Sequence, residues 1–71
     1  MRILFFGRLA DRFGRELELD AAEGCTVADL RQRLALNDPA SRACVGESLV
    51  GDEFILGSAG EVEFWPPVSG G

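Results

Sequence analysis

The sequence of 71 residues contains no lysine, no histidine and no tyrosine, and only two cysteines. All seven basic residues are arginines, so a polymeric protein tag joined through lysine side chains cannot be built on this chain. Without histidine, a metal site would have to rest on the distant thiols of Cys25 and Cys44, and we therefore expect no bound metal. In a reducing compartment these cysteines are expected to be buried small hydrophobic residues rather than a disulfide.

Long apolar runs and a basic surface are also missing. The longest apolar run near the start covers residues 3–6, which is too short for a signal peptide or a membrane span, so we expect a cytoplasmic protein. A net charge of −5 argues against nucleic-acid binding, which requires a basic footprint, and against an anionic membrane surface. The same charge would attract a basic protein partner.

The patterns that are present predict one small α+β domain. A chain of this length buries only about 60% of its unfolded surface, so its stability margin is thin. Residues 15–20 and 61–65 alternate between polar and apolar, as half-buried strands do, whereas residues 2–7 are apolar on both faces, as in a central strand. We expect the first two strands to form an antiparallel hairpin. Their connection, over residues 7–14, carries three apolar residues that should fold back onto the domain.

A helix is predicted after the hairpin. Thr26 has the marks of its N-cap, and Asp29 at the third helical position completes an acidic capping box. The helix should end near Leu36 and bury the apolar face formed by Val27, Leu30 and Leu34, while Arg31 and Arg33 point away from that face. Beyond a break with one short turn over residues 37–39, strands are predicted over residues 42–45 and 49–50, and then over the final alternating segment.

The last strand runs into a stiff exit and a bare tail. Pro66 and Pro67 cannot donate to a sheet ladder, so they end the strand, and we place the domain at residues 1–67. Residues 68–71 form a flexible tail that ends in two glycines, which are costly to order and bury nothing. Because Gly70 and Gly71 have no side chains, they can thread a narrow channel and present the terminal carboxylate to a reagent.

The end of the chain resembles the small, sulfur-carrying subunit of molybdopterin synthase. In that family a last strand ending in two aromatic residues runs into P-P-V-[ST]-G-G, and this sequence matches the pattern at Phe64, Trp65, Pro66, Pro67, Val68, Ser69, Gly70 and Gly71. The opening residues 3–7 are also similar to the first strand of the family. A terminal Gly-Gly alone is shared by all ubiquitin-like carriers, whereas the aromatic pair joined to this tail is much more specific.

The resemblance implies a β-grasp, or ubiquitin-like, fold. Such a fold has a mixed sheet of four to five strands, with the first and last strands adjacent at its centre and one main helix across one face. The resemblance further implies that an ATP-dependent activating enzyme adenylates Gly71 and that a sulfur donor protein converts it to a thiocarboxylate. The large subunit would then use this sulfur for dithiolene formation in molybdenum cofactor biosynthesis.

By the same resemblance, the chain itself would bind no cofactor, and two copies would assemble on a dimer of large subunits. The large subunit would supply the catalytic side chains. Two other classes of function stay open. One is a sulfur carrier for thiamine, cysteine or tRNA thiolation, and the other is a ubiquitin-like protein modifier.

A partner-binding face is expected on the outer side of the sheet. Parity places Val62 and Phe64 in the core and Trp65 outside, close to Phe6 if the first and last strands are neighbours. Leu49 matches a family position that meets the partner. The expected partner-binding residues are Phe6, Leu49, Trp65, Pro66, Pro67, Val68 and Ser69. The alternative is that Phe6 or Trp65 tucks against residues 8–14.

The remaining charged residues have simpler interpretations. Four carboxylates on strands are expected to face water and to favour solubility and edge protection over a catalytic pair: Glu16, Glu18, Glu61 and Glu63. Three arginines could grip an acidic patch on a partner or form a solvated loop face, and both interpretations stay open: Arg8, Arg12 and Arg15. Cys25 is expected to pack at the start of the helix and not to relay sulfur. The sequence departs from the family at residues 46–47, where an Asn-containing turn is more usual, and at Trp65, where Phe is common.

Overall fold

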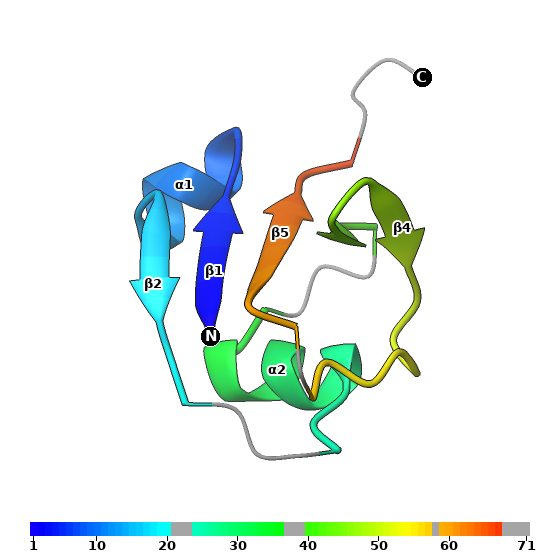
Figure 1. Ribbon diagram of the computed structural model, residues 1–71. Coiled ribbons are helices and arrows are strands. Elements are labelled where there is room, and N and C mark those ends of the chain that lie inside the picture. Colours follow the sequence, from blue (N-terminus) through cyan, green and yellow to red (C-terminus); the bar gives the residue numbers. More distant parts are fainter. Residues whose placement is uncertain (21–23, 37–39, 58, 68–71) are drawn as a thin grey trace.

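The computed structural model describes residues 1–20, 24–36, 40–57 and 59–67 of the chain. Within them, five strands form one sheet and are accompanied by two helices (Figure 1). The strands are β1 (Arg2–Phe5), β2 (Glu16–Glu18), β3 (Arg42–Val45), β4 (Ser48–Val50) and β5 (Glu61–Trp65), and the helices are α1 (Arg8–Phe13) and α2 (Val27–Leu34). The predicted order of elements is confirmed, with α1 in addition. The predicted break and turn at residues 37–39 lie outside the described residues.

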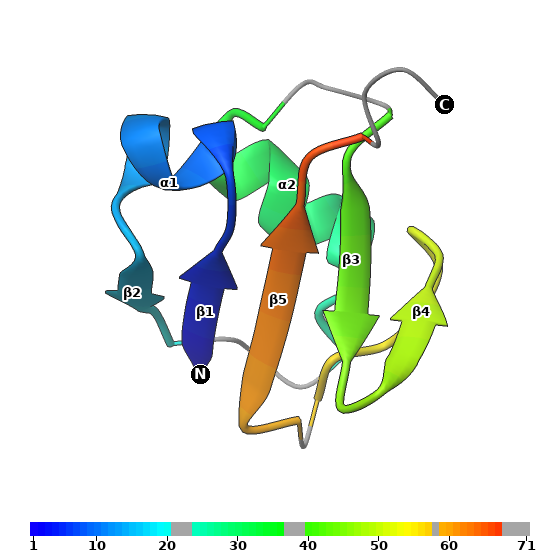
Figure 2. The same ribbon diagram turned by 90° about the horizontal axis from the view of Figure 1, so that it is seen from above.

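The first and last strands lie side by side in the middle of the sheet. The strand order is β2-β1-β5-β3-β4, in which β1 and β5 are parallel and the other neighbouring pairs are antiparallel (Figure 2). Ile3 pairs with Val62 and Phe5 with Phe64 in the central ladder. Helix α2 lies across one face of the sheet, as both views show. This is the predicted β-grasp arrangement, and β1 and β2 form the predicted hairpin.

The core lies between α2 and the inner face of the sheet. The largest fully buried side chains come from both layers and from the segment before β5: Ile3, Val27, Leu30, Leu56, Val62 and Phe64. Burying each of these is worth about 1.5–3 kcal/mol, which makes them the main source of stability in so small a domain. Phe5 adds aromatic contacts, because its ring stacks on Phe13 at 4.8 Å and on Phe64 at 6.0 Å between centroids.

The N-terminus of α2 is closed by its own side chains. The Thr26 hydroxyl accepts a hydrogen bond from the Asp29 backbone N–H at 3.2 Å, and the Asp29 carboxylate accepts one from the Thr26 N–H at 3.0 Å. The predicted capping box is thus confirmed. The helix ends at Leu34 rather than near Leu36, because Ala35 adopts the left-handed conformation with φ of 55°. Leu36 is nevertheless buried in the core.

The connection expected over residues 7–14 contains a helix, α1, that the sequence interpretation missed. Its apolar residues do fold back onto the domain, with Leu9 buried and Ala10 and Phe13 packed against the core. The helix has only six residues, no side-chain cap, and glycines with positive φ at both ends. The usual signals for a helix are therefore absent, apart from the i, i+4 spacing of Leu9 and Phe13.

Arg31 does not point away from the core, contrary to the prediction. Its guanidinium donates to the Asp52 carboxylate at 2.9 Å, to the Ser41 carbonyl at 2.8 Å and to the Ser41 hydroxyl, and it lies over the Phe64 ring. The side chain is only 14% exposed. Charge-assisted hydrogen bonds to two loops offset the cost of burying this cation, so Arg31 ties α2 to the start of β3 and to the segment after β4.

The two cysteines differ in their surroundings. Cys25 is buried beside the start of α2, as expected, and both thiols are free, with no disulfide between them. Cys44 is half-buried in β3. Successive residues of a strand alternate between the two faces, so β3 turns Ala43 into the core and Cys44 to the opposite face.

Candidate functional site

The outer face of the sheet is the face that α2 leaves uncovered. The ladders align Leu4 with Glu63, Glu63 with Cys44, and Cys44 with Leu49, so these four residues form one row across β1, β5, β3 and β4. The next row towards the carboxyl end of β5 holds Trp65. Side chains of one row share a face because successive residues of a strand alternate. The outer face thus combines apolar and charged side chains, because Glu63 lies within the first row and Arg42 pairs with Trp65 in the next.

Phe6 and Trp65 stack on one another at this end of the sheet. Their ring centroids are 3.9 Å apart and their planes differ by 4°. The Trp65 indole N–H also donates to the Glu63 carboxylate at 3.1 Å, which fixes the ring over the outer face. Trp65 is 40% exposed, and Phe6 is half-buried. The prediction that these two aromatic residues lie close together outside the core is confirmed.

Leu49 extends the apolar surface to the edge strand β4. It is 61% exposed, so its side chain contributes little to the core. Two other large apolar residues among those described are exposed, Phe54 and Ile55, but they lie beside the start of α2, where Ile55 bridges Thr26. We call Phe6, Trp65 and Leu49 the outer apolar patch. Exposed apolar surface of this kind, next to charged groups, is typical of a protein contact.

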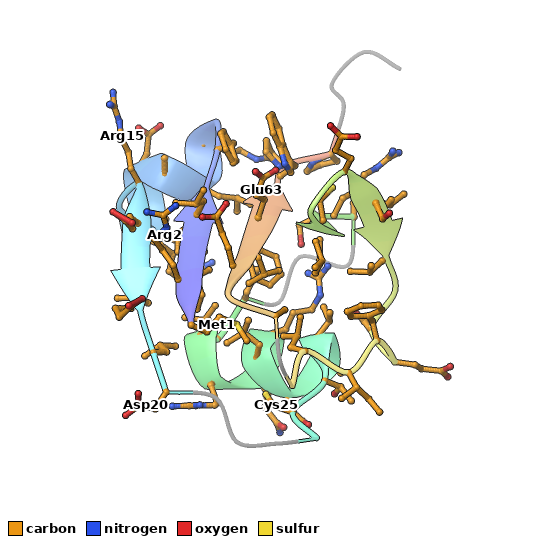
Figure 3. The ribbon with its side chains drawn as sticks, viewed as in Figure 1. Met1, Arg2, Arg15, Asp20, Cys25 and Glu63 are labelled. Atoms are coloured by element: carbon orange, nitrogen blue, oxygen red, sulfur yellow. The ribbon has the colours of Figure 1, made fainter. Side chains whose placement is uncertain are left out.

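The amino end of the same face is charged. Arg2 donates to the Glu61 carboxylate at 2.9 Å and forms an ion pair with Glu16 at 3.2 Å. Hydrogen bonding to Glu61, followed by the charges of Glu61 and Glu16, raises the pKa of Arg2 above its ordinary value. Figure 3 shows Arg2 on β1 and Glu63 on the neighbouring β5. Two of the four strand carboxylates are therefore held by a cation, which suits a surface ion-pair network rather than a catalytic pair.

Pro66 begins the exit of the chain and packs against Gly7. A Cβ atom added to Gly7 would lie 2.7 Å from Cγ of the proline ring, and the glycine has φ of +58°. Only glycine adopts this conformation at little cost and also leaves room for the ring. The Gly7–Pro66 contact therefore fixes how the chain leaves the sheet. The predicted tail residues lie outside the described residues: Val68, Ser69, Gly70 and Gly71.

The arginines around α1 are not equivalent. Arg12 donates to the Ala35 carbonyl at 3.2 Å and lies over the Phe13 ring at 4.8 Å, so it is engaged within the domain. Arg15 is exposed at the start of β2, at the opposite end of the sheet from Met1 and Asp20 (Figure 3). Of the two interpretations for this group, partner contact suits Arg15 better than Arg12.

A hollow beside Phe6 was not foreseen from the sequence. It has a volume of about 540 Å³ and is lined by Leu4, Phe5, Phe6, Gly7, Ala10, Asp11 and Arg15. The small side chain of Ala10 on α1 leaves this space open. Because α1 itself was missed, only the spacing of Leu9 and Phe13 could have indicated that Ala10 and Asp11 face the end of the first strand.

The described residues present an exposed surface that is suited to contact with another protein. Over residues 1–20, 24–36, 40–57 and 59–67, no group of three histidine, cysteine, aspartate or glutamate side chains is placed to hold a metal ion. Within the same ranges, the helices are too short and too polar to cross a bilayer. An exposed aromatic stack, Phe6 on Trp65, lies directly before Pro66, where the chain leaves the sheet. Such an arrangement can dock a partner and aim the residues that follow.

Comparison with known proteins gives two matches that cover the chain. The model of the ThiS family matches residues 3–71. The chain is also 35% identical, over an alignment of 80 residues, to a protein of Escherichia coli (strain K12) named molybdopterin synthase sulfur carrier subunit. That alignment covers all of this chain and 99% of the relative, so the similarity extends from the first strand to the final glycines.

Proposed function

The chain belongs to the ThiS family, and on this basis we propose that it is the sulfur-carrier small subunit of a molybdopterin synthase. Its similarity in full length to the Escherichia coli sulfur carrier subunit supports the assignment. The observation that carries it in the structure is the Phe6–Trp65 stack, exposed immediately before Pro66. A carrier must be gripped by its partner close to the point from which its reactive tail is delivered.

The proposed chemistry takes place at Gly71. A carboxylate is a poor electrophile at neutral pH, so the terminal group is first converted to a mixed anhydride with AMP at the expense of ATP. The outer sulfur of a persulfide on the sulfur donor protein then attacks the terminal carbonyl and displaces AMP, which gives an acyl disulfide. A thiol of the donor protein cleaves the S–S bond, so that a disulfide forms on the donor and the thiocarboxylate is released at Gly71. The thiocarboxylate is a soft nucleophile that gives up sulfur readily. Gly70 and Gly71 carry no side chains, which suits passage through a narrow channel to the place of reaction.

The partners follow from this chemistry. The large subunit of molybdopterin synthase would hold a pterin substrate, supply the catalytic side chains and receive the tail. An ATP-dependent activating enzyme would recharge Gly71 after each transfer. The chain would bind no cofactor of its own, and two copies would assemble on a dimer of large subunits in the cytoplasm. Binding of the tail by the large subunit would hold the thiocarboxylate beside the pterin. This proximity would provide much of the rate advantage that such a complex can offer.

The outer apolar patch supplies the proposed docking surface. Trp65 and Leu49 are exposed and do not belong to the core. The ring of Phe6 stacks on the Trp65 indole and supports it. Interface anchors are often aromatic residues surrounded by contacts that exclude water. Pro66 and Pro67 then lead away from this patch towards residues 68–71, so a partner that covers Trp65 also meets the exit of the chain.

Affinity capture with purified candidates tests the proposal. The immobilised protein should retain the large subunit of molybdopterin synthase and the activating enzyme from the same organism. It should not retain a thiazole synthase, and it should not form conjugates with other proteins. In a reconstituted assay, deletion of Gly71 should abolish sulfur transfer while the melting temperature stays unchanged. Binding to a thiazole synthase in place of the large subunit, or full activity without Gly71, would overturn the assignment.

A further inference from the structure

Glu63 and Trp65 lie two residues apart on β5, so their side chains share the outer face of the sheet. The Trp65 indole N–H donates to the Glu63 carboxylate at 3.1 Å. In the ladders, Glu63 pairs with Leu4 on one side and with Cys44 on the other, and neither of these residues is a cation. The charge of Glu63 is therefore placed beside the aromatic stack rather than beside a basic group.

The carboxylate two residues earlier on the same strand has a different partner. Glu61 accepts a hydrogen bond from Arg2 at 2.9 Å, so a cation balances its charge. Within the part of the chain that the structure describes, Glu63 forms no ion pair, and the donor that it meets is the indole N–H. A charged acceptor strengthens a hydrogen bond, so this bond can hold a side chain that is 40% exposed.

The stack alone does not account for the orientation of the indole. Aromatic pairs prefer offset or edge-to-face arrangements, with ring centroids about 4.5–7 Å apart, over direct face-to-face contact. Phe6 and Trp65 are closer than this, at 3.9 Å, and their planes differ by only 4°. The hydrogen bond to Glu63 restricts the side-chain torsions of Trp65, and it thereby favours the flat arrangement over the others that an exposed ring could adopt.

We propose that Glu63 is a positioning residue, which holds the Trp65 indole flat against Phe6 in the free protein. The ring is then in place before a partner arrives. Ordering a mobile side chain at an interface opposes binding, and order that already exists in the free protein removes this cost. The consequence for docking rests on the proposed function, whereas the hold of Glu63 on the indole is a property of the isolated chain.

The isolated protein allows a direct test, because Trp65 is the only tryptophan and the chain has no tyrosine. Near-ultraviolet circular dichroism and fluorescence anisotropy decay therefore report on this one ring. Glu63→Ala should weaken the tryptophan band and speed the local motion of the indole. Glu63→Gln, whose amide oxygen still accepts a hydrogen bond, should retain most of both signals. Glu61→Ala is the matched control, since it removes a carboxylate from the same strand, and it should leave both signals at the wild-type level.

Binding to the purified large subunit of molybdopterin synthase tests the consequence for docking. Glu63→Ala should weaken binding about threefold, and Glu63→Gln should restore most of the affinity. In a Trp65→Phe background, where the ring has no N–H to donate, Glu63→Ala should cause no further loss. This comparison separates a role through the indole from a direct contact of Glu63 with the partner, which would be lost equally in both backgrounds.

The outcomes distinguish this inference from the proposed function. Wild-type tryptophan signals in Glu63→Ala, or an equal loss of affinity in both backgrounds, would overturn the inference and leave the proposed function standing. Failure of the wild type to bind the large subunit would overturn the proposed function. The spectra of the isolated variants would still decide whether Glu63 holds the indole.

Discussion

The aromatic rings of Phe6 and Trp65 lie parallel, 3.9 Å apart, on the face of the sheet opposite the core. The parallel pairing of β1 with β5 places the two residues next to each other, because Phe5 pairs with Phe64 immediately before them. Their stack is exposed at the point where the chain leaves the sheet at Pro66. The residues on the core face of the sheet stabilise the fold, whereas this stack on the opposite face is available to a partner.

Trp65→Ala should weaken binding of the large subunit while leaving the isolated domain folded. Truncating an aromatic anchor at an interface typically costs 2 kcal/mol or more, which is over tenfold in affinity. Loss of the stack with Phe6 should lower the free energy of unfolding by only about 0.5–1.5 kcal/mol. Thermal melting of the isolated variant, followed by titration with the large subunit, measures both quantities. Trp65→Phe is the control and should retain most of the affinity.

The opposite result would place Trp65 in the core. Truncation of a buried aromatic residue costs about 3–5 kcal/mol, which is enough to unfold a domain with so thin a stability margin. An unfolded Trp65→Ala protein would therefore contradict the assignment of this residue to the outer apolar patch.

Leu49→Ala should show how far the docking surface reaches towards β4. Ile55 is the matched control, because it is 62% exposed, against 61% for Leu49, but lies beside α2 rather than on the outer face. The free energy of unfolding of both alanine variants should lie within about 0.5 kcal/mol of the wild-type value, as is usual for substitutions at exposed positions. Only Leu49→Ala should weaken binding of the large subunit, by less than Trp65→Ala does. Equal effects of the two variants would show that the contact does not extend to Leu49.

Arg31→Ala should destabilise the fold without changing the residues of the outer face. The variant loses charge-assisted hydrogen bonds to Asp52 and Ser41, and such bonds are worth about 1.5–3 kcal/mol. On a domain of this size each kcal/mol lowers the melting temperature by about 4–8 °C. Arg33→Ala, two residues further along α2, loses only an exposed hydrogen bond to the Asp20 carbonyl and should change the free energy of unfolding by about 0.5 kcal/mol. Matching melting curves for the two variants would argue against this role of Arg31.

Much of the fold could be predicted because the informative patterns are local. The alternation in β5 correctly assigned Val62 and Phe64 to the core and Trp65 to the outside, and the capping box correctly located the start of α2. The pairing of β1 with β5 is not a local property. It came from the family resemblance, and the closeness of Phe6 and Trp65 depended on it.

The errors arose where tertiary contacts decide the outcome. Arg31 was assigned to the solvent because helical spacing places it off the apolar stripe, yet partners in two distant loops make its burial favourable. Helix α1 was missed because six residues between glycines give little periodic signal. The hollow next to Ala10 could not be predicted without that helix.

The central claim is that Gly71 carries sulfur, and the intact mass of the protein tests it most directly. The protein is incubated with the activating enzyme, ATP and a persulfide donor, and its C-terminal peptide is then sequenced by mass spectrometry. The account predicts that one oxygen is exchanged for sulfur at Gly71, only when ATP is present. An unchanged mass, or a gain of sulfur without loss of oxygen that maps to Cys25 or Cys44, would contradict it.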